Sequence, residues 1–287
     1  MLSEIGFGLL AALGWGAGDF LAKLSSDQIG YVRTALYMQF ISALFLIPFS
    51  IPDIPRLWQY PQATAGAVGL GIISLIGLLA LYKGFQVGRL SIVSPIVSGY
   101  PTITSLFAVL LLAEMLSTGR ILGIVVTISG ILLISLRSQT TGHPNKPAPA
   151  SGILYAFSAF VLFGLLYLAM KLVVVILGIW LPILILRWVS ASILAISLIA
   201  SGRNFSPPSS KPFLIVVFVG VLDTFGNIAF NLGVVSGSVA IVATLSGLFS
   251  AVTVGLAWLF LRDRISMFQM LGILAVLGGV SLIGLFV

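Results

Sequence analysis

An aspartate stands inside an apolar stretch of this chain, in the segment GWGAGDFLAK that begins at Gly14. Trp15, Asp19 and Lys23 are spaced four residues apart, so in a helix they share one face. Gly14 and Gly18 form a small-xxx-small pair through which a neighbouring helix approaches closely. An ionisable group at that depth is costly unless it faces a cavity or a partner. Asp19 is therefore a candidate site for a solute or a proton, and the alternative is a structural acid bridged to Lys23.

A second polar stripe lies in the segment VLDTFGNIAFNLG, where Asp223, Asn227 and Asn231 again recur every four residues. Such a ridge along a long apolar run predicts a water-filled path or a binding pocket. The alternative is a seam of hydrogen bonds between helices.

Arg187 stands in the middle of another apolar run, in the segment LRWVS. Its run and that of Asp223 are consecutive, so as antiparallel helices they place these two residues at similar depth. An arginine binds a carboxylate through two parallel hydrogen bonds, and Asp223 is its expected counter-ion when the site is empty. The alternative is a permanent structural ion pair.

Three tyrosines within the apolar runs, Tyr82, Tyr100 and Tyr167, are candidate cavity aromatics together with Trp15. Their alternative role is anchoring at a membrane interface. Tyr100 lies between Pro95 and Pro101, which predict a bend in their helix because proline lacks the amide hydrogen.

The composition predicts what kind of element positions these residues. Of the 287 residues, 59% are hydrophobic and 7% are charged, and the mean hydropathy is +1.21. A water-facing surface needs about 25% charged residues, so the chain is an integral membrane protein. Its apolar runs are continuous rather than alternating and long enough to span a bilayer, which predicts an all-α fold of ten transmembrane helices. The predicted spans are 5–24, 31–50, 62–84, 90–112, 118–136, 151–173, 177–199, 212–233, 238–261 and 267–287.

Several kinds of chemistry are disfavoured. The chain has no cysteine, and its one histidine, His143, lies in the polar, proline-rich connector 137–150. A membrane enzyme with a thiol, histidine or metal centre is therefore not expected, and neither is any cofactor or bound metal. The net charge of +7 comes from basic residues scattered singly, so it indicates membrane topology rather than a nucleic-acid partner.

The two sides of the connector are related in sequence. Shifting the chain by 149 residues aligns 88–130 with 237–279 without a gap, and a shift of 148 aligns Gly16 and Lys23 with Gly164 and Lys171. The matched pairs include Gly88 with Gly237, Glu114 with Asp263, Ser117 with Ser266, Gly123 with Gly272 and Gly130 with Gly279. We predict two five-helix repeats, 1–137 and 151–287, joined by the linker 138–150. Because five is odd, the second repeat crosses the membrane in the opposite sense, and a binding site is expected at the repeat interface.

The turns after the fourth and ninth spans read EMLS and DRIS. Glu114 and Asp263 end their runs, and Ser117 and Ser266 are expected helix caps; Ser266 and Gln269 have the capping-box spacing. Together with the five-plus-five spans and the glycines of the fifth and tenth spans, these turns resemble the drug/metabolite transporter superfamily, in its EamA branch.

The resemblance implies a secondary transporter, an exporter of small metabolites such as amino acids. The alternatives are a flippase for lipids or lipid-linked headgroups on the same scaffold and, more distantly, a membrane enzyme. No nucleotide-binding GxxxxGK[ST] motif occurs, so energy is expected from a gradient. Without a membrane histidine, Asp19 and Asp223 are the candidate coupling acids for a proton, and Asp19 is the one expected to titrate.

Lysine and arginine in the loops predict the orientation. Ten lie in one set of loops and three, Arg56, Arg120 and Lys171, in the other, which places the first set in the cytoplasm and both termini outside. The expected location is the plasma membrane, with a small-molecule substrate and the lipid bilayer as partners. The oligomeric state, monomer or homodimer, is left open.

Overall fold

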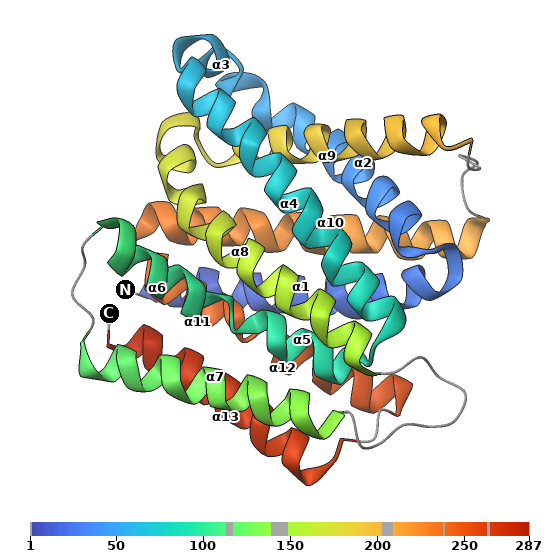
Figure 1. The fold of residues 1–287 in the computed structure, drawn as a ribbon. Helices are drawn as coiled ribbons and strands as arrows, with labels where there is room; N and C mark the ends of the chain where they lie inside the picture. The colour runs from blue at the N-terminus through green and yellow to red at the C-terminus, as the bar shows by residue number, and fades with distance from the viewer. Residues whose placement is uncertain are drawn as a thin grey trace.

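The fold is given by a computed structural model that describes residues 2–112, 117–138, 149–202, 209–237, 239–262 and 265–286. Within these ranges the chain forms helices and no strand (Figure 1). The first half contains α1 (Leu2–Ile29), α2 (Tyr31–Ser50), η1 (Ile51–Asp53), α3 (Arg56–Gln59), α4 (Pro61–Val87), α5 (Leu90–Ser98), α6 (Tyr100–Leu112) and α7 (Thr118–Ser138). The second half contains α8 (Pro149–Leu177), α9 (Trp180–Ala200), α10 (Ser210–Ser236), α11 (Val239–Gly247), α12 (Phe249–Leu256), the π-helix η2 (Ala257–Leu261) and α13 (Met267–Leu285).

Eight of the described helical segments are long and apolar enough to cross a membrane. This confirms the prediction of an all-α, multi-pass integral membrane protein. The eight correspond to eight of the ten predicted spans. The other two are α7, whose described apolar stretch is Thr118–Leu133, and the predicted span 90–112, which is divided between α5 and α6.

The fourth and ninth spans each break near their middle, at Gly99 and at Leu248. The amide of each donates a hydrogen bond three residues back rather than four, at 3.3 Å and 3.1 Å. These positions are 149 residues apart, so the break is repeated in both halves. Pro101 accounts for the first because it lacks an amide hydrogen, whereas Ser250 stands in its place in the second half. The second break thus occurs without a proline, and it lies against the first: a Cβ on Gly247 would lie 3.0 Å from the carbonyl oxygen of Ser98.

The two halves pack against each other through reciprocal pairs of helices. The first helix of each repeat lies against the third membrane helix of the other, so α1 packs along α10 and α8 along α4. The second helices pair with each other (α2 with α9), and so do the last (α7 with α13), which lie side by side in Figure 1. This reciprocal pairing is what a two-fold axis between the halves produces.

The direction of the helices shows that the second repeat is inverted. Gly14 of α1 approaches Gly226 of α10, whereas Gly18 approaches Asp223, so residue numbers run in opposite directions along this pair. Helix α8 runs in the same sense as α10, because one membrane helix, α9, lies between them. Helices α1 and α8, which hold the same place in their repeats, are therefore antiparallel.

Individual contacts repeat across the axis. The Thr104 hydroxyl donates to the carbonyl oxygen of Gly164 at 3.0 Å, and the Thr253 hydroxyl donates to that of Gly16 at 3.2 Å. The threonines are 149 residues apart and the glycines 148. The glycines have no side chain because the broken helix of the other repeat occupies that place: a Cβ on Gly164 would lie 3.0 Å from the Tyr100 carbonyl oxygen.

Two predicted helix caps are present. The Ser266 hydroxyl accepts from the Gln269 amide at 3.2 Å, and the Gln269 side chain accepts from the Ser266 amide at 3.0 Å, which confirms the capping box. The Ser117 hydroxyl likewise accepts from the Arg120 amide at 3.3 Å. Glu114, Asp263 and His143 lie outside the described residues.

Candidate functional site

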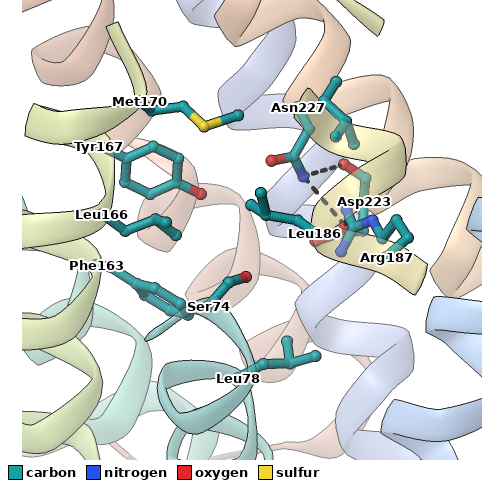
Figure 2. A pocket seen from close by; sticks show the side chains of 11 residues that line it. Ser74, Leu78, Phe163, Leu166, Tyr167, Met170, Leu186, Arg187, Asp223 and Asn227 are labelled. Carbon is teal, nitrogen blue, oxygen red and sulfur yellow. Dashed lines mark hydrogen bonds and ion pairs between the residues drawn. The ribbon is translucent and has the colours of Figure 1, made fainter. Parts of the chain in front are cut away.

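Two small cavities lie between the repeats, on either side of a shared wall. Each has a volume of about 40 Å³. The first is bounded by α4, α8, α9 and α10, and Figure 2 shows it from close by. The second is bounded by α1, α4, α6, α8, α10 and α12. Both are lined by Leu78, Phe163, Tyr167 and Asp223.

The first cavity contains the Arg187 and Asp223 pair. The guanidinium of Arg187 forms an ion pair with the Asp223 carboxylate through Nη2. Its Nη1 donates to Gln39 Oε1 on α2 at 2.7 Å. The Asn227 side-chain amide donates to Asp223 Oδ2 at 3.1 Å, one helical turn along α10 (Figure 2). Two protein acceptors and one neighbouring amide thus hold the charged groups in fixed orientations.

The opposite wall of the first cavity is formed by α8. In Figure 2 the Phe163 and Tyr167 side chains lie across the cavity from Arg187, Asp223 and Asn227. The cavity therefore has one polar, charged wall and one aromatic wall. This is the usual composition of a pocket that recognises a small organic solute.

The second cavity contains Asp19. Its carboxylate has no hydrogen-bond or ion-pair partner among the residues that the structure describes, and the side chain is partly exposed to the cavity. The bridge to Lys23 that was the alternative in the sequence is wrong, because Lys23 Nζ pairs with Asp27 at 2.9 Å instead. Lysine 23 lies near the end of α1, where Asp27 is one turn further along, while Asp19 points into the protein.

Tyr167 is the centre of an aromatic cluster around the second cavity. Its ring centroid lies 5.2 Å from Trp15, 4.9 Å from Tyr100 and 4.8 Å from Phe230. Trp15 fits here because α10 has a glycine opposite it: a Cβ on Gly226 would lie 2.7 Å from the indole nitrogen. The glycines of α1 and α10 thus allow the two helices to approach and leave room for the indole ring between them.

Not all predicted site residues line the cavities. Tyr82 is buried beside Phe85, with ring centroids 6.2 Å apart, and lines neither cavity. Asn231 donates to the Ile179 carbonyl oxygen at 2.8 Å and anchors the turn between α8 and α9. Tyr100 lines the second cavity, and its hydroxyl is hydrogen-bonded to Ser246 at 2.6 Å.

Sequence reasoning missed two residues of the site that the repeat alignment could have found. Gln39, which holds the Arg187 guanidinium, stands 148 residues before it. Phe163, which lines both cavities, stands 148 residues after Trp15. Both are therefore the counterparts, in the other repeat, of residues that the sequence already singled out.

Comparison with known proteins agrees with this architecture. The profile of the EamA-like transporter family matches residues 2–136 and 150–285. The uncharacterized protein MJ1333.1 of Methanocaldococcus jannaschii is 29% identical over 141 residues, which cover 98% of that protein and 47% of this chain, so it is similar to a single repeat. A protein of known crystal structure superposes with a TM-score of 0.72 at 16% identity, over 98% of this chain and 96% of its own, and shares the fold. The two matches of the family profile together cover nearly the whole length, and they show that this chain belongs to the EamA-like transporter family.

Proposed function

We propose that this protein is a secondary transporter that exports small zwitterionic metabolites, such as amino acids, by alternating access between its two repeats. The observation that carries the proposal is the ion pair of Arg187 and Asp223 in a cavity at the repeat interface. Membership of the family supports transport across a membrane, and the charges of the site suggest the class of solute.

The cavities combine one cation with two acids. Arg187 is suited to a carboxylate, because its planar fork matches the two oxygens. Asp19 and Asp223 are suited to an ammonium group, which the neighbouring aromatic rings also favour. A zwitterion satisfies both kinds of partner at once and adds no net charge to a site that lies within the membrane.

The two cavities are too small to hold a metabolite in the described structure. A cavity of 40 Å³ has room for about three water molecules, whereas pockets for metabolites measure about 300–1,000 Å³. A solute therefore enters only when helices of the two repeats separate. Exchanging the conformations of two inverted repeats then opens the site on one side of the membrane and closes it on the other.

Replacing Arg187 by lysine tests the site. Lysine keeps the positive charge and loses the fork, so Arg187→Lys is expected to reduce transport by about tenfold or more, the effect of one charge-assisted hydrogen bond. A thermal-shift screen of the purified protein against metabolite classes first identifies a solute, and its transport is then measured in proteoliposomes.

The matched control is Arg56→Lys, at the first residue of α3, an arginine that pairs with Asp53 at 3.3 Å. This variant is expected to transport like the unmodified protein. Full transport by Arg187→Lys would give Arg187 a structural role only. If no metabolite is transported and the protein instead exchanges a fluorescent phospholipid between leaflets, the flippase alternative holds.

A further inference from the structure

A third and larger cavity lies beyond the first one, at the ends of the same helices. It is lined by the last turns of α8 and α10, by the turn between α8 and α9, and by Asp53 and Arg56 of the first repeat. Its volume is about 580 Å³, whereas that of the first cavity is about 40 Å³. Pockets that bind metabolites measure about 300–1,000 Å³. This cavity, the vestibule, therefore has the room for a solute that the first cavity lacks.

The vestibule and the first cavity are separated by about one helical turn. On α8, Met170 lines the first cavity and Val174 lines the vestibule. At the start of α9, Ile183 lines the first cavity and Ile179 lines the vestibule. In both cases the two residues are four apart, which is a rise of about 6 Å along a helix axis. The two cavities thus lie one behind the other between the same helices.

One hydrogen bond lies within the layer that separates them. Asn231 stands on α10 between Asn227, which lines the first cavity, and Val234, which lines the vestibule. Its side-chain amide donates to the Ile179 carbonyl oxygen at 2.8 Å and so joins α10 to the turn between α8 and α9. Asn231 is 2% exposed and lines neither cavity. It belongs to the wall between them.

The turn that provides this carbonyl oxygen is held on its other side by the first repeat. Gly178 has a φ of +87°, which residues with a side chain rarely adopt, and a Cβ there would lie 2.9 Å from Asp53 Oδ2. Asp53 is itself held by its pair with Arg56 at 3.3 Å. The turn is therefore packed between Asp53 and α10, and the hydrogen bond of Asn231 is its polar contact with α10.

We propose that the vestibule is an additional site for the solute, at the outer end of its pathway, and that the Asn231–Ile179 hydrogen bond is the barrier between this site and the first cavity. When the bond breaks, the turn moves away from α10 and the two cavities join. The freed amide and carbonyl groups then offer hydrogen bonds to a polar solute as it passes. This inference rests on the proposed function, because it gives the route by which the zwitterion leaves the first cavity.

Lys171 gives the vestibule a charge that suits the carboxylate end of a zwitterion. Arg56 and Asp53 compensate each other at the rim. Lys171 also lines the vestibule, its side chain is exposed, and it has no ion-pair partner among the described residues. An uncompensated lysine beside a cavity raises the local concentration of anionic groups.

Cysteine accessibility tests the route, because the chain has no cysteine of its own. Ser74→Cys places a thiol in the first cavity, and Val234→Cys places one in the vestibule. Intact cells are treated with a small, membrane-impermeant methanethiosulfonate, either cationic or anionic. The thiols that remain are then measured with a fluorescent maleimide on the denatured protein. We expect Val234→Cys to react from outside and Ser74→Cys to react more slowly.

Asn231→Leu removes the donor with little change in size. In the Ser74→Cys protein we expect it to raise the reaction rate about tenfold, the effect of one hydrogen bond on an opening equilibrium. Gln86→Leu is the matched control, because Gln86 donates to the Ser26 carbonyl oxygen at 3.1 Å near the end of α1, which lies at the beginning of the antiparallel α10 and so on the opposite side of the membrane. It is expected to leave the rate from outside unchanged.

Lys171→Gln tests the charge of the vestibule. In the Val234→Cys protein it is expected to lower the rate of the anionic reagent relative to that of the cationic one. This comparison does not involve Asn231, so it tests the vestibule even if Asn231→Leu does not fold. An unchanged ratio of the two rates would remove Lys171 from the site.

The outcomes separate this inference from the proposed function. If Asn231→Leu folds and leaves the rate of Ser74→Cys unchanged, the barrier is overturned. If Val234→Cys does not react from outside, the vestibule is overturned. Neither measurement involves transport, so both results leave the proposed function intact. Conversely, a route opened by Asn231→Leu in a protein that transports no metabolite of the screen overturns the proposed function and keeps the route.

Discussion

Asp19 and Asp223 are both acids in the membrane part of the molecule, but their surroundings differ. Asp223 faces the Arg187 guanidinium and accepts from Asn227, so its negative charge is compensated within the protein. Asp19 has no such partner among the described residues, and its neighbours in the second cavity are the aromatic rings of Trp15 and Tyr167 together with Asp223. An uncompensated acid in a membrane cavity is the group best placed to take up a proton or a cation.

We therefore predict that Asp19→Asn abolishes accumulation of the solute against its gradient but keeps passive exchange. The amide has the shape of the carboxylic acid and does not titrate, so binding persists while the link to the proton gradient is lost. Transport is measured in proteoliposomes with and without an imposed pH gradient.

The control for this substitution is Asp27→Asn, at the acid that pairs with Lys23 on the surface of the same helix. It is expected to accumulate solute as the unmodified protein does. Accumulation by Asp19→Asn under a pH gradient would exclude Asp19 as the coupling residue. An unmodified protein that ignores the pH gradient would exclude proton coupling altogether.

At the scale of the helices, the close contact between α7 and α13 depends on glycine. These helices close the two repeats against each other, and their backbones come near because Gly123, Gly130 and Gly279 have no side chains. A Cβ on Gly279 would lie 2.7 Å from the Gly123 carbonyl oxygen and 2.6 Å from the Thr127 amide nitrogen. Both are backbone atoms, which cannot turn away as a flexible side chain would.

Gly279→Ala is therefore expected to destabilise the protein by about 1–3 kcal/mol, the usual cost of overpacking. The adjacent Gly278 provides a matched control, because nothing lies within 4 Å of a Cβ placed there. Gly278→Ala should leave stability unchanged or raise it slightly, since alanine favours the helix over glycine. The apparent unfolding temperatures of both variants in detergent decide the matter, and equal temperatures would contradict the close contact of α7 with α13.

At the scale of the whole molecule, the inverted repeats determine whether equivalent loops lie on the same side of the membrane or on opposite sides. The loop between α2 and α4 and the loop before α10 hold the same place in the two repeats, with Tyr60 aligned to Ser209. Inversion requires these loops to lie on opposite sides of the membrane. The distribution of lysine and arginine further predicts that Tyr60 is outside and Ser209 in the cytoplasm.

Single-cysteine variants test both statements, because the chain has no cysteine of its own. We expect a membrane-impermeant maleimide to label Tyr60→Cys in intact cells and Ser209→Cys only after lysis. Both side chains are exposed, so access is limited by the membrane rather than by burial. Labelling of both from the same side would contradict the inverted repeats. Labelling of Ser209→Cys alone from outside would keep the inversion and reverse the orientation.

Much of the architecture could be read from the amino-acid sequence, because it depends on local composition and on similarity along the chain. The apolar runs determine which segments cross a bilayer, since no other segment can leave water at an acceptable cost. The spacing of glycines, acids and serines between the halves indicated the duplication. Even the depth of Arg187 and Asp223 followed from their distances to the ends of consecutive spans.

The composition of the site was decided by tertiary packing. Lys23 does not form an ion pair with Asp19, because it pairs with Asp27, which lies one turn further along α1. Gln39 enters the site because α2 packs on α9, and Asn231 leaves it because the turn between α8 and α9 offers a carbonyl oxygen. Helical periodicity tells which side chains share a face, but it does not tell which segment provides their partners: Gln39 comes from 148 residues before Arg187, and Ile179 from 52 residues before Asn231. Those partners are set by which helices pack against each other, and only the folded molecule shows it.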